Sequence, residues 1–263
     1  MSRPRQANAL RFPYNQRFLL AYWRTLYFTP GEYAAQRDRN AAWNRGAYLV
    51  QGLGHCSACH APRNGLGASV DQEGLGGGMM GEQGWHAPAL GGQRDAAQLA
   101  ELLRSGVSAQ GAVAGPMAEV VGASLQHVRA DDVDAIAQYL VTLPAGAAST
   151  PGTSAPEPVL RQGGAIYRRQ CASCHGEQGE GVARAYPRLT DGPAVNAIRM
   201  VLDGGYSPST ADNPRPFGMP PFSAALSDAE VAAVLSYVRA SWGNRGAAVL
   251  PQDVGRLRAT PGH

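Results

Sequence analysis

The sequences CSACH at residues 56–60 and CASCH at residues 171–175 contain all four cysteines of this 263-residue chain. Each frame is a CxxC pair followed at once by histidine, which is the attachment signal for c-type haem. The spacing suits the chemistry, because two thiols add across the haem vinyl groups and the next residue reaches the iron. The sequence therefore predicts two covalently bound haem c groups. The predicted thioether residues are Cys56, Cys59, Cys171 and Cys174, and the predicted proximal iron ligands are His60 and His175.

Three other uses of paired cysteines fit less well. A structural zinc site expects its CxxC pairs about 15–20 residues apart, whereas 111 residues separate Cys59 from Cys171 and both histidines would have no role. A dithiol redox centre expects a strand-to-helix setting, which neither frame has. Two disulfides within the CxxC pairs would constrain a chain of this length very little.

One order of elements is repeated around the two frames. The predicted helices span 44–53, 96–103 and 132–143 in the first copy, and 159–170, 195–202 and 228–242 in the second. The closing helix of each copy carries apolar residues at i, i+3, i+4 and i+7, the spacing of a buried helix face. These residues are Val133, Ile136, Ala137 and Leu140 in the first copy, and Val231, Val234, Leu235 and Val238 in the second. Ser227 and Glu230 add a predicted capping box.

The second axial ligand of each iron is expected further along each copy. Met117 and Met219 each stand beside proline, in a predicted loop before the closing helix. Proline stiffens a backbone that must hold a weak thioether ligand on iron. His86 and His127 are rival ligands in the first copy, although single histidines in polar loops are usually solvated.

Pro88 and Pro187 follow the two frames in matching Pro-x-Leu sequences. Each is predicted to offer its carbonyl to the Nδ1–H of the proximal histidine, a contact that fixes the tautomer of a ligating imidazole. Ligation by histidine and methionine raises the potential of a haem. It also fills the coordination shell, which favours electron transfer over substrate chemistry.

Basic charge is concentrated near the N-terminus. All 23 basic residues are arginine, and residues 1–45 hold eight of them against two acidic residues, although the net charge of the chain is only +3. That small excess gives no reason to expect nucleic-acid binding. The same segment carries an aromatic stripe at helical spacing, for which packing against the first copy is expected and partner docking or membrane-surface contact is the alternative. The stripe consists of Phe18, Leu19, Tyr22, Trp23, Leu26 and Tyr27.

The chain contains no run of 18 apolar residues, so no membrane-spanning helix is expected. The apolar stretch that follows Arg17 is interrupted by Arg24, so the sequence has no recognisable export signal.

Further motifs are shared with a known family. They are LRFPYNQR at 10–17, WNRGAYLV at 43–50, GHC at 54–56 leading to PRN at 62–64, GPMAEVV at 115–121, and YVR at 237–239 with WGN at 242–244. Over most of residues 10–258 the chain resembles the multi-haem cytochrome c subunits of bacterial membrane-bound alcohol, gluconate and sorbitol dehydrogenases. Those subunits usually carry three haem modules, and this chain resembles the second and third.

The resemblance implies an electron-transfer subunit with a dehydrogenase catalytic subunit as its partner. Its downstream acceptor would be a quinone, a cytochrome or a terminal oxidase. It also implies a periplasmic location, because bacteria attach haem c on the outer side of the inner membrane, and peripheral association with that membrane is a further expectation. The first haem module and the export signal are the points at which this sequence departs from the family.

The sequence thus predicts an all-α fold of two consecutive class I-type cytochrome c modules. The expected organisation is a basic and aromatic arm at 1–40, modules at 41–143 and 159–245, a Pro/Ala/Ser linker at 144–158, and a C-terminal tail at 246–263. The expected function is a dihaem electron relay without catalytic residues of its own. A dihaem peroxidase-like enzyme with one open iron position is one alternative, and a free dihaem electron shuttle is another.

Overall fold

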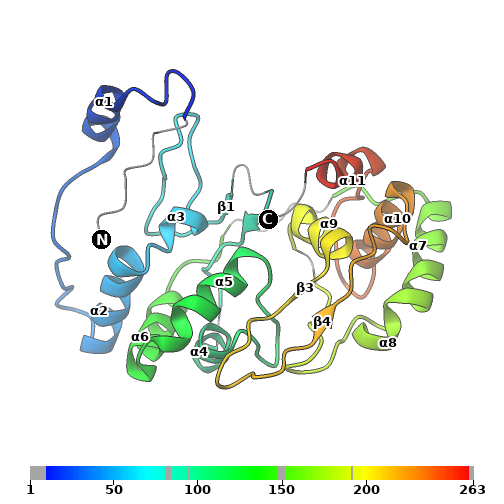
Figure 1. Ribbon diagram of the computed structural model, residues 1–263. Helices are drawn as coiled ribbons and strands as arrows, with labels where there is room; N and C mark the ends of the chain where they lie inside the picture. The colour runs from blue at the N-terminus through cyan, green and yellow to red at the C-terminus, as the bar shows by residue number, and fades with distance from the viewer. Residues whose placement is uncertain (1–9, 81–83, 94, 147–151, 191, 261–263) are drawn as a thin grey trace, which may run out of the picture. The chain divides into compact units, whose positions relative to one another are not determined.

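The computed structural model describes residues 10–80, 84–93, 95–146, 152–190 and 192–260 (Figure 1). The chain divides into two compact units, Met1–Ala35 and Gln36–His263. In the smaller unit, helix α1 spans Arg17–Tyr27, as the aromatic stripe predicts, and none of its residues is buried. No helix in these described ranges is both long enough and apolar enough to cross a membrane.

The larger unit is mostly helical, as expected, and its first half covers residues 36–146. Asn40 and Asp95 accept backbone N–H groups with their side chains and so cap the helices that follow them. The elements of this half are α2 (Ala41–Tyr48), a π-helical turn (Leu49–Leu53), α3 (Ser57–His60), β1 (Gly78–Met79), β2 (His86–Ala87), α4 (Ala96–Ser105), α5 (Pro116–Ala123), a 3-10 turn (Leu125–His127) and α6 (Ala130–Leu140). Strands β1 and β2 form a short antiparallel hairpin in which Met79 faces His86.

The second half covers residues 152–260 and has a similar order of elements. These are α7 (Glu157–Gln170), α8 (Ala172–His175), α9 (Ala194–Asp203), β3 (Gly205–Tyr206), β4 (Gly218–Met219), α10 (Asp228–Ala240) and α11 (Pro251–Arg258). Its core is built mainly from apolar side chains of the helices, among them Tyr167, Ile198, Val231 and Val254. The two short hairpins are the departure from an all-α fold.

The predicted helix faces are confirmed. Val133, Ile136, Ala137 and Leu140 of α6 are buried, and so are Val231, Val234 and Leu235 of α10, while Val238 is half-buried against the same core. The predicted capping box is also present, because the Ser227 side chain accepts the Glu230 N–H and the Glu230 carboxylate accepts the Ser227 N–H. Both closing helices end two or three residues before the predicted position.

Each half is organised around one close helix crossing. Helix α2 packs on α6, and α7 packs on α10 (Figure 1). At the first crossing, a Cβ on Gly46 would clash with the carbonyl oxygen of Ala135. At the second, a Cβ on Gly163 would clash in the same way with the carbonyl oxygen of Ala233. Backbone therefore lies directly on backbone, and only glycine allows that approach.

The π-helical turn explains a difference in spacing between the halves. Cys56 lies ten residues after Gly46, whereas Cys171 lies eight residues after Gly163. In the second half α7 continues unbroken to the residue before Cys171. In the first half the wider π-helical turn takes up additional residues before the frame. Both frames consequently begin just beyond their crossing helix.

The segments expected as linker and tail are in contact with the helical halves where they are described. Residues 147–151 of the expected linker lie outside the described residues. At its start, a Cβ on Gly91 would clash with the carbonyl oxygen of Pro144, and further along Gly152 N donates to Arg245 O. The expected C-terminal tail instead contains α11, whose Val254 is fully buried in the core of the second half.

We predict that Gly46→Ala lowers the free energy of unfolding by about 1–3 kcal/mol, the usual cost of overpacking a tight contact. Denaturant unfolding of the mature protein, followed by far-UV circular dichroism, measures this change. Gly52→Ala is the matched control, because Gly52 is a nearby helical glycine with open space around its Cα. Equal stability of the two variants would contradict the backbone contact at the crossing.

Candidate haem sites

The first CxxCH frame ends in a buried, anchored histidine. His60 closes the short helix α3 and is 9% exposed. Its Nδ1 lies 2.7 Å from the carbonyl oxygen of Pro88. The backbone oxygen of His60 also accepts a hydrogen bond from Gly77 N at 2.7 Å, so the chain after the frame folds back under it.

The second frame has the same geometry. His175 closes α8, is 9% exposed, and has its Nδ1 3.0 Å from the carbonyl oxygen of Pro187. Its backbone oxygen accepts from Gly181 N at 2.9 Å. The predicted pairing of each proximal histidine with a proline carbonyl is therefore confirmed in both frames.

This contact sets the chemistry of both imidazoles. A proline carbonyl can only accept, so Nδ1 carries the proton and Nε2 keeps its lone pair. Burial lowers the pKa of His60 and of His175, although each carbonyl acts in the opposite direction. Both rings are consequently neutral near pH 7, which is the form that binds metal.

The four cysteines of the two frames are free thiols. All four are half-buried and free of disulfides. Burial raises the pKa of Cys56 to about 11 and that of Cys171 to about 11. A reactive dithiol needs a depressed pKa, so these frames do not have the electrostatics of a redox centre. Within the described ranges no group of three or more His, Cys, Asp or Glu side chains could hold a metal ion.

The structure moves the two candidate methionine ligands out of the expected loops. Met117 lies in the first turn of α5, directly after Pro116, because the φ angle of proline also suits the start of a helix. Met219 lies in β4, opposite Gly205. Both side chains are half-buried. Their role as iron ligands stays a prediction.

Two glycines fix the backbone beside these methionines, and sequence reasoning missed both. Gly115 has φ +55°, and a Cβ there would lie 2.8 Å from the ring of the buried Trp85. Gly204 has φ +68° and ψ −160°, a region open only to glycine, and it lies against the carbonyl oxygen of Met219. Gly115 closely precedes Met117 in the sequence and could have been noticed there. Gly204 belongs to another segment than Met219, so only the packed structure relates the two.

The two rival histidines differ from each other. His127 is exposed, as expected for a solvated residue. The expectation is wrong for His86, which lies in β2 and has a buried Nδ1 without a hydrogen-bond partner among the described residues.

The residues of both frames fit haem c. Each frame offers two free thiols on one turn of chain and a neutral imidazole with Nε2 available. Cys56, Cys59 and His60 would hold one group, and Cys171, Cys174 and His175 the other.

Comparisons with known proteins identify relatives of this chain. Residues 158–238 match the family described as cytochrome c oxidase, cbb3-type, subunit III. The cytochrome c subunit of quinone alcohol dehydrogenase from Gluconobacter oxydans is 34% identical, over 97% of this chain and 59% of its own length. The gluconate 2-dehydrogenase cytochrome c subunit of Pantoea cypripedii is 35% identical, over 94% of this chain and 63% of its own length. A nicotinate dehydrogenase subunit of Pseudomonas putida is 37% identical, over 97% of this chain and 23% of its own length.

The homologues of this chain are cytochrome c subunits of dehydrogenases. The resemblance stated from the sequence motifs is thereby confirmed. Such cytochrome c subunits are electron-transfer subunits and not the catalytic subunits of their complexes. This chain spans less than two thirds of the length of these relatives.

Proposed function

We propose that this chain is a dihaem c-type cytochrome that relays single electrons from a periplasm-facing dehydrogenase subunit to a quinone, a cytochrome or a terminal oxidase. One observation carries the proposal. Two CxxCH frames, far apart in sequence, each end in a buried histidine whose Nδ1 faces a proline carbonyl at 2.7 or 3.0 Å. The same contact is present in both frames, and a ligating imidazole almost always donates its other ring N–H to such a partner.

Each residue of the two sites has a proposed role. Bound haem supplies a reversible one-electron change between Fe(II) and Fe(III). His60 and His175 would hold the iron through a neutral Nε2, and Met117 and Met219 would each supply a thioether as the second ligand. The soft sulfur favours the reduced metal and raises the potential. The four thioether residues are Cys56, Cys59, Cys171 and Cys174.

A relay is favoured over an enzyme by the same set of ligands. With histidine and methionine on both irons, neither site keeps an open position for peroxide or another substrate. The dihaem peroxidase-like alternative requires one site to be open or to open on reduction. The names of the relatives support a dehydrogenase catalytic subunit as the electron donor.

The smaller unit supports peripheral membrane association of the proposed relay. Phe18, Tyr22 and Leu26 of α1 are each at least half exposed, and the same helix contains Arg17 and Arg24. Aromatic side chains with flanking arginine suit the interface of an anionic bilayer. We therefore place the contact with the inner membrane on α1.

We expect the mature protein to sediment with vesicles that contain anionic phospholipid. A Phe18→Glu, Tyr22→Glu variant should lose most of this binding, because two carboxylates would enter the apolar face of α1. Leu66→Glu, at another highly exposed leucine, is the matched control and should bind like the parent. Undiminished binding by the α1 variant would remove α1 from the membrane contact and favour its packing against protein.

We expect protein matured in a host with a haem c attachment system to carry two haems per chain. Intact-mass measurement should show two haem increments, and Cys171→Ala with Cys174→Ala should remove one of them. The matching pair Cys56→Ala with Cys59→Ala should remove the other. A colourless parent protein, or loss of both haems from either pair of changes, would contradict two independent attachment sites.

We expect Met219→His to keep both haems and to lower one reduction potential, because imidazole stabilises Fe(III) better than a thioether does. The shift should fall within the roughly 0.8 V range that axial ligands span, measured by spectroscopic redox titration. Met79→His, at a methionine that is 52% exposed, is the control and should leave both potentials unchanged.

The same samples discriminate the proposed relay from its alternatives. Two low-spin haems that do not react with peroxide support the relay, whereas a high-spin haem in either redox state supports the peroxidase-like enzyme. Potentials that Met219→His leaves unchanged would remove Met219 from the site. If no dehydrogenase co-purifies with the protein when it is extracted from its native membrane, a free dihaem shuttle would be favoured.

A further inference from the structure

One side chain of the second half clamps the backbone of the first half beside its haem site. Asn196 lies on α9, and its Oδ1 accepts the His86 N–H at 2.8 Å. Its Nδ2 donates to the carbonyl oxygen of His86, also at 2.8 Å. A single amide therefore satisfies both main-chain groups of one residue, across 110 positions of sequence.

This clamp acts on the free edge of β2. The N–H and C=O of one residue in an extended strand point to the same side, and in an antiparallel pair only alternate residues bond to the partner strand. His86 faces Met79 of β1 but directs its own polar groups to Asn196. Strand β2 is thus held between β1 on one edge and α9 on the other.

The clamped residue lies two positions before the carbonyl that anchors His60. Strand β2 ends at Ala87, and the next residue, Pro88, contacts the imidazole Nδ1 at 2.7 Å. The angle at which that carbonyl meets the ring depends on where β2 lies. A second contact supports the same placement, because a Cβ on Gly84 would lie 2.6 Å from Nη2 of the buried Arg199, one turn after Asn196 on α9.

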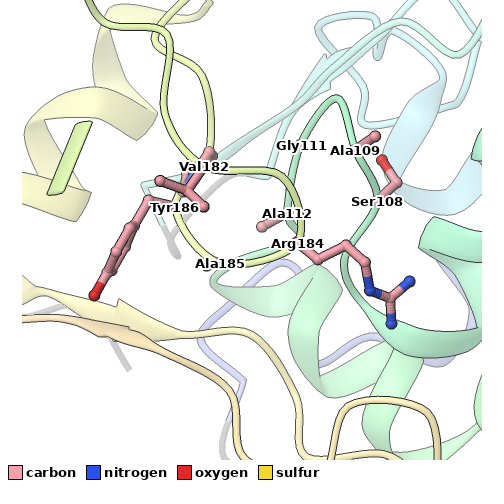
Figure 2. Close-up of a pocket in the computed structure, with 9 residues that line it drawn as sticks. Ser108, Ala109, Gly111, Ala112, Val182, Arg184, Ala185 and Tyr186 are labelled. Atoms are coloured by element: carbon pink, nitrogen blue, oxygen red, sulfur yellow. The ribbon is translucent and has the colours of Figure 1, made fainter. Parts of the chain in front are cut away.

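The anchor of His175 has no such clamp. Both proline loops are closed in part by their own backbone, because Leu189 N donates to Gly179 O just as Leu90 N donates to Leu75 O. The loop that carries Pro187 has in addition a hydrogen bond from Val182 N to Tyr186 O. This loop contacts the other half in the crevice of Figure 2, where Arg184 N donates to Ser108 O. The Arg184 guanidinium also pairs with Glu101 of that half. Asn196 has no hydrogen bond to this loop among the described residues.

We propose that Asn196 is a positioning residue for the haem site of the other half: by clamping His86 it holds the Pro88 carbonyl on His60, and so sets the electronic character of that proximal ligand. The proposal rests on the proposed haem attachment at residues 56–60. A carbonyl that accepts the Nδ1–H makes the imidazole more basic and stabilises Fe(III). Loosening the clamp should therefore raise the potential of the first haem and leave that of the second unchanged.

The test is a redox titration of three variants of the full-length mature protein. Asn196→Ala removes the clamp, and Asn196→Leu removes it while filling its volume, so equal effects of the two exclude a cavity as the cause. Asn244→Ala is the matched control, since this asparagine of the second half donates to Leu189 O and Val238 O within that half. The component displaced by Met219→His identifies the second haem.

We expect both Asn196 variants to shift the first potential upward and to leave the second in place, and Asn244→Ala to leave the first in place. Residue-resolved hydrogen exchange supplies a readout without haem: the His86 amide should exchange faster in both Asn196 variants. Equal shifts of both potentials, or an unchanged first potential, would overturn the proposal. If the parent protein takes up no haem, the proposed function fails, and an unchanged His86 exchange rate would then separately overturn the clamp.

Discussion

The hydrogen bond between a buried imidazole and a proline carbonyl is the contact on which each half of the larger unit depends. It assigns the proton to Nδ1, leaves Nε2 available, and holds the ring at one angle. Burial lowers the pKa of both histidines, so the rings are neutral where a metal ligand must be. The free thiols on the preceding turn, with a pKa of about 11 at Cys56 and at Cys171, do not have the depressed pKa of a reactive dithiol and fit the proposed haem attachment.

The helices serve this contact by fixing where each frame begins. Gly46 and Gly163 let the helix before each frame lie directly on the backbone of the closing helix, so the two helices can approach to backbone contact. The π-helical turn then absorbs the two additional residues before Cys56. Beyond each frame, the chain folds back onto the histidine. A glycine N–H there donates to the histidine carbonyl oxygen, and a proline carbonyl oxygen lies at hydrogen-bond distance from the ring Nδ1.

The two sites share a backbone closure but differ in how the other half contacts them. Leu90 N donates to Leu75 O after Pro88, as Leu189 N donates to Gly179 O after Pro187. Asn196 of the second half binds the main chain of the strand before Pro88, whereas the loop before Pro187 contacts the first half through Arg184.

Sequence alone predicted the haem-attachment frames and determined the local helices, because both depend on residues a few positions apart. The CxxCH spacing, the apolar periodicity of α6 and α10, the capping box at Ser227 and the two histidine–proline pairs were all readable in this way. The two hairpins, the helical setting of Met117 and the burial of α11 were not, since they depend on what packs against them. Only the tertiary structure showed that the Asn196 side chain on α9 hydrogen-bonds the main chain of His86, 110 residues earlier. Contacts over that distance arise from the packing of whole helices and leave no local pattern in the sequence.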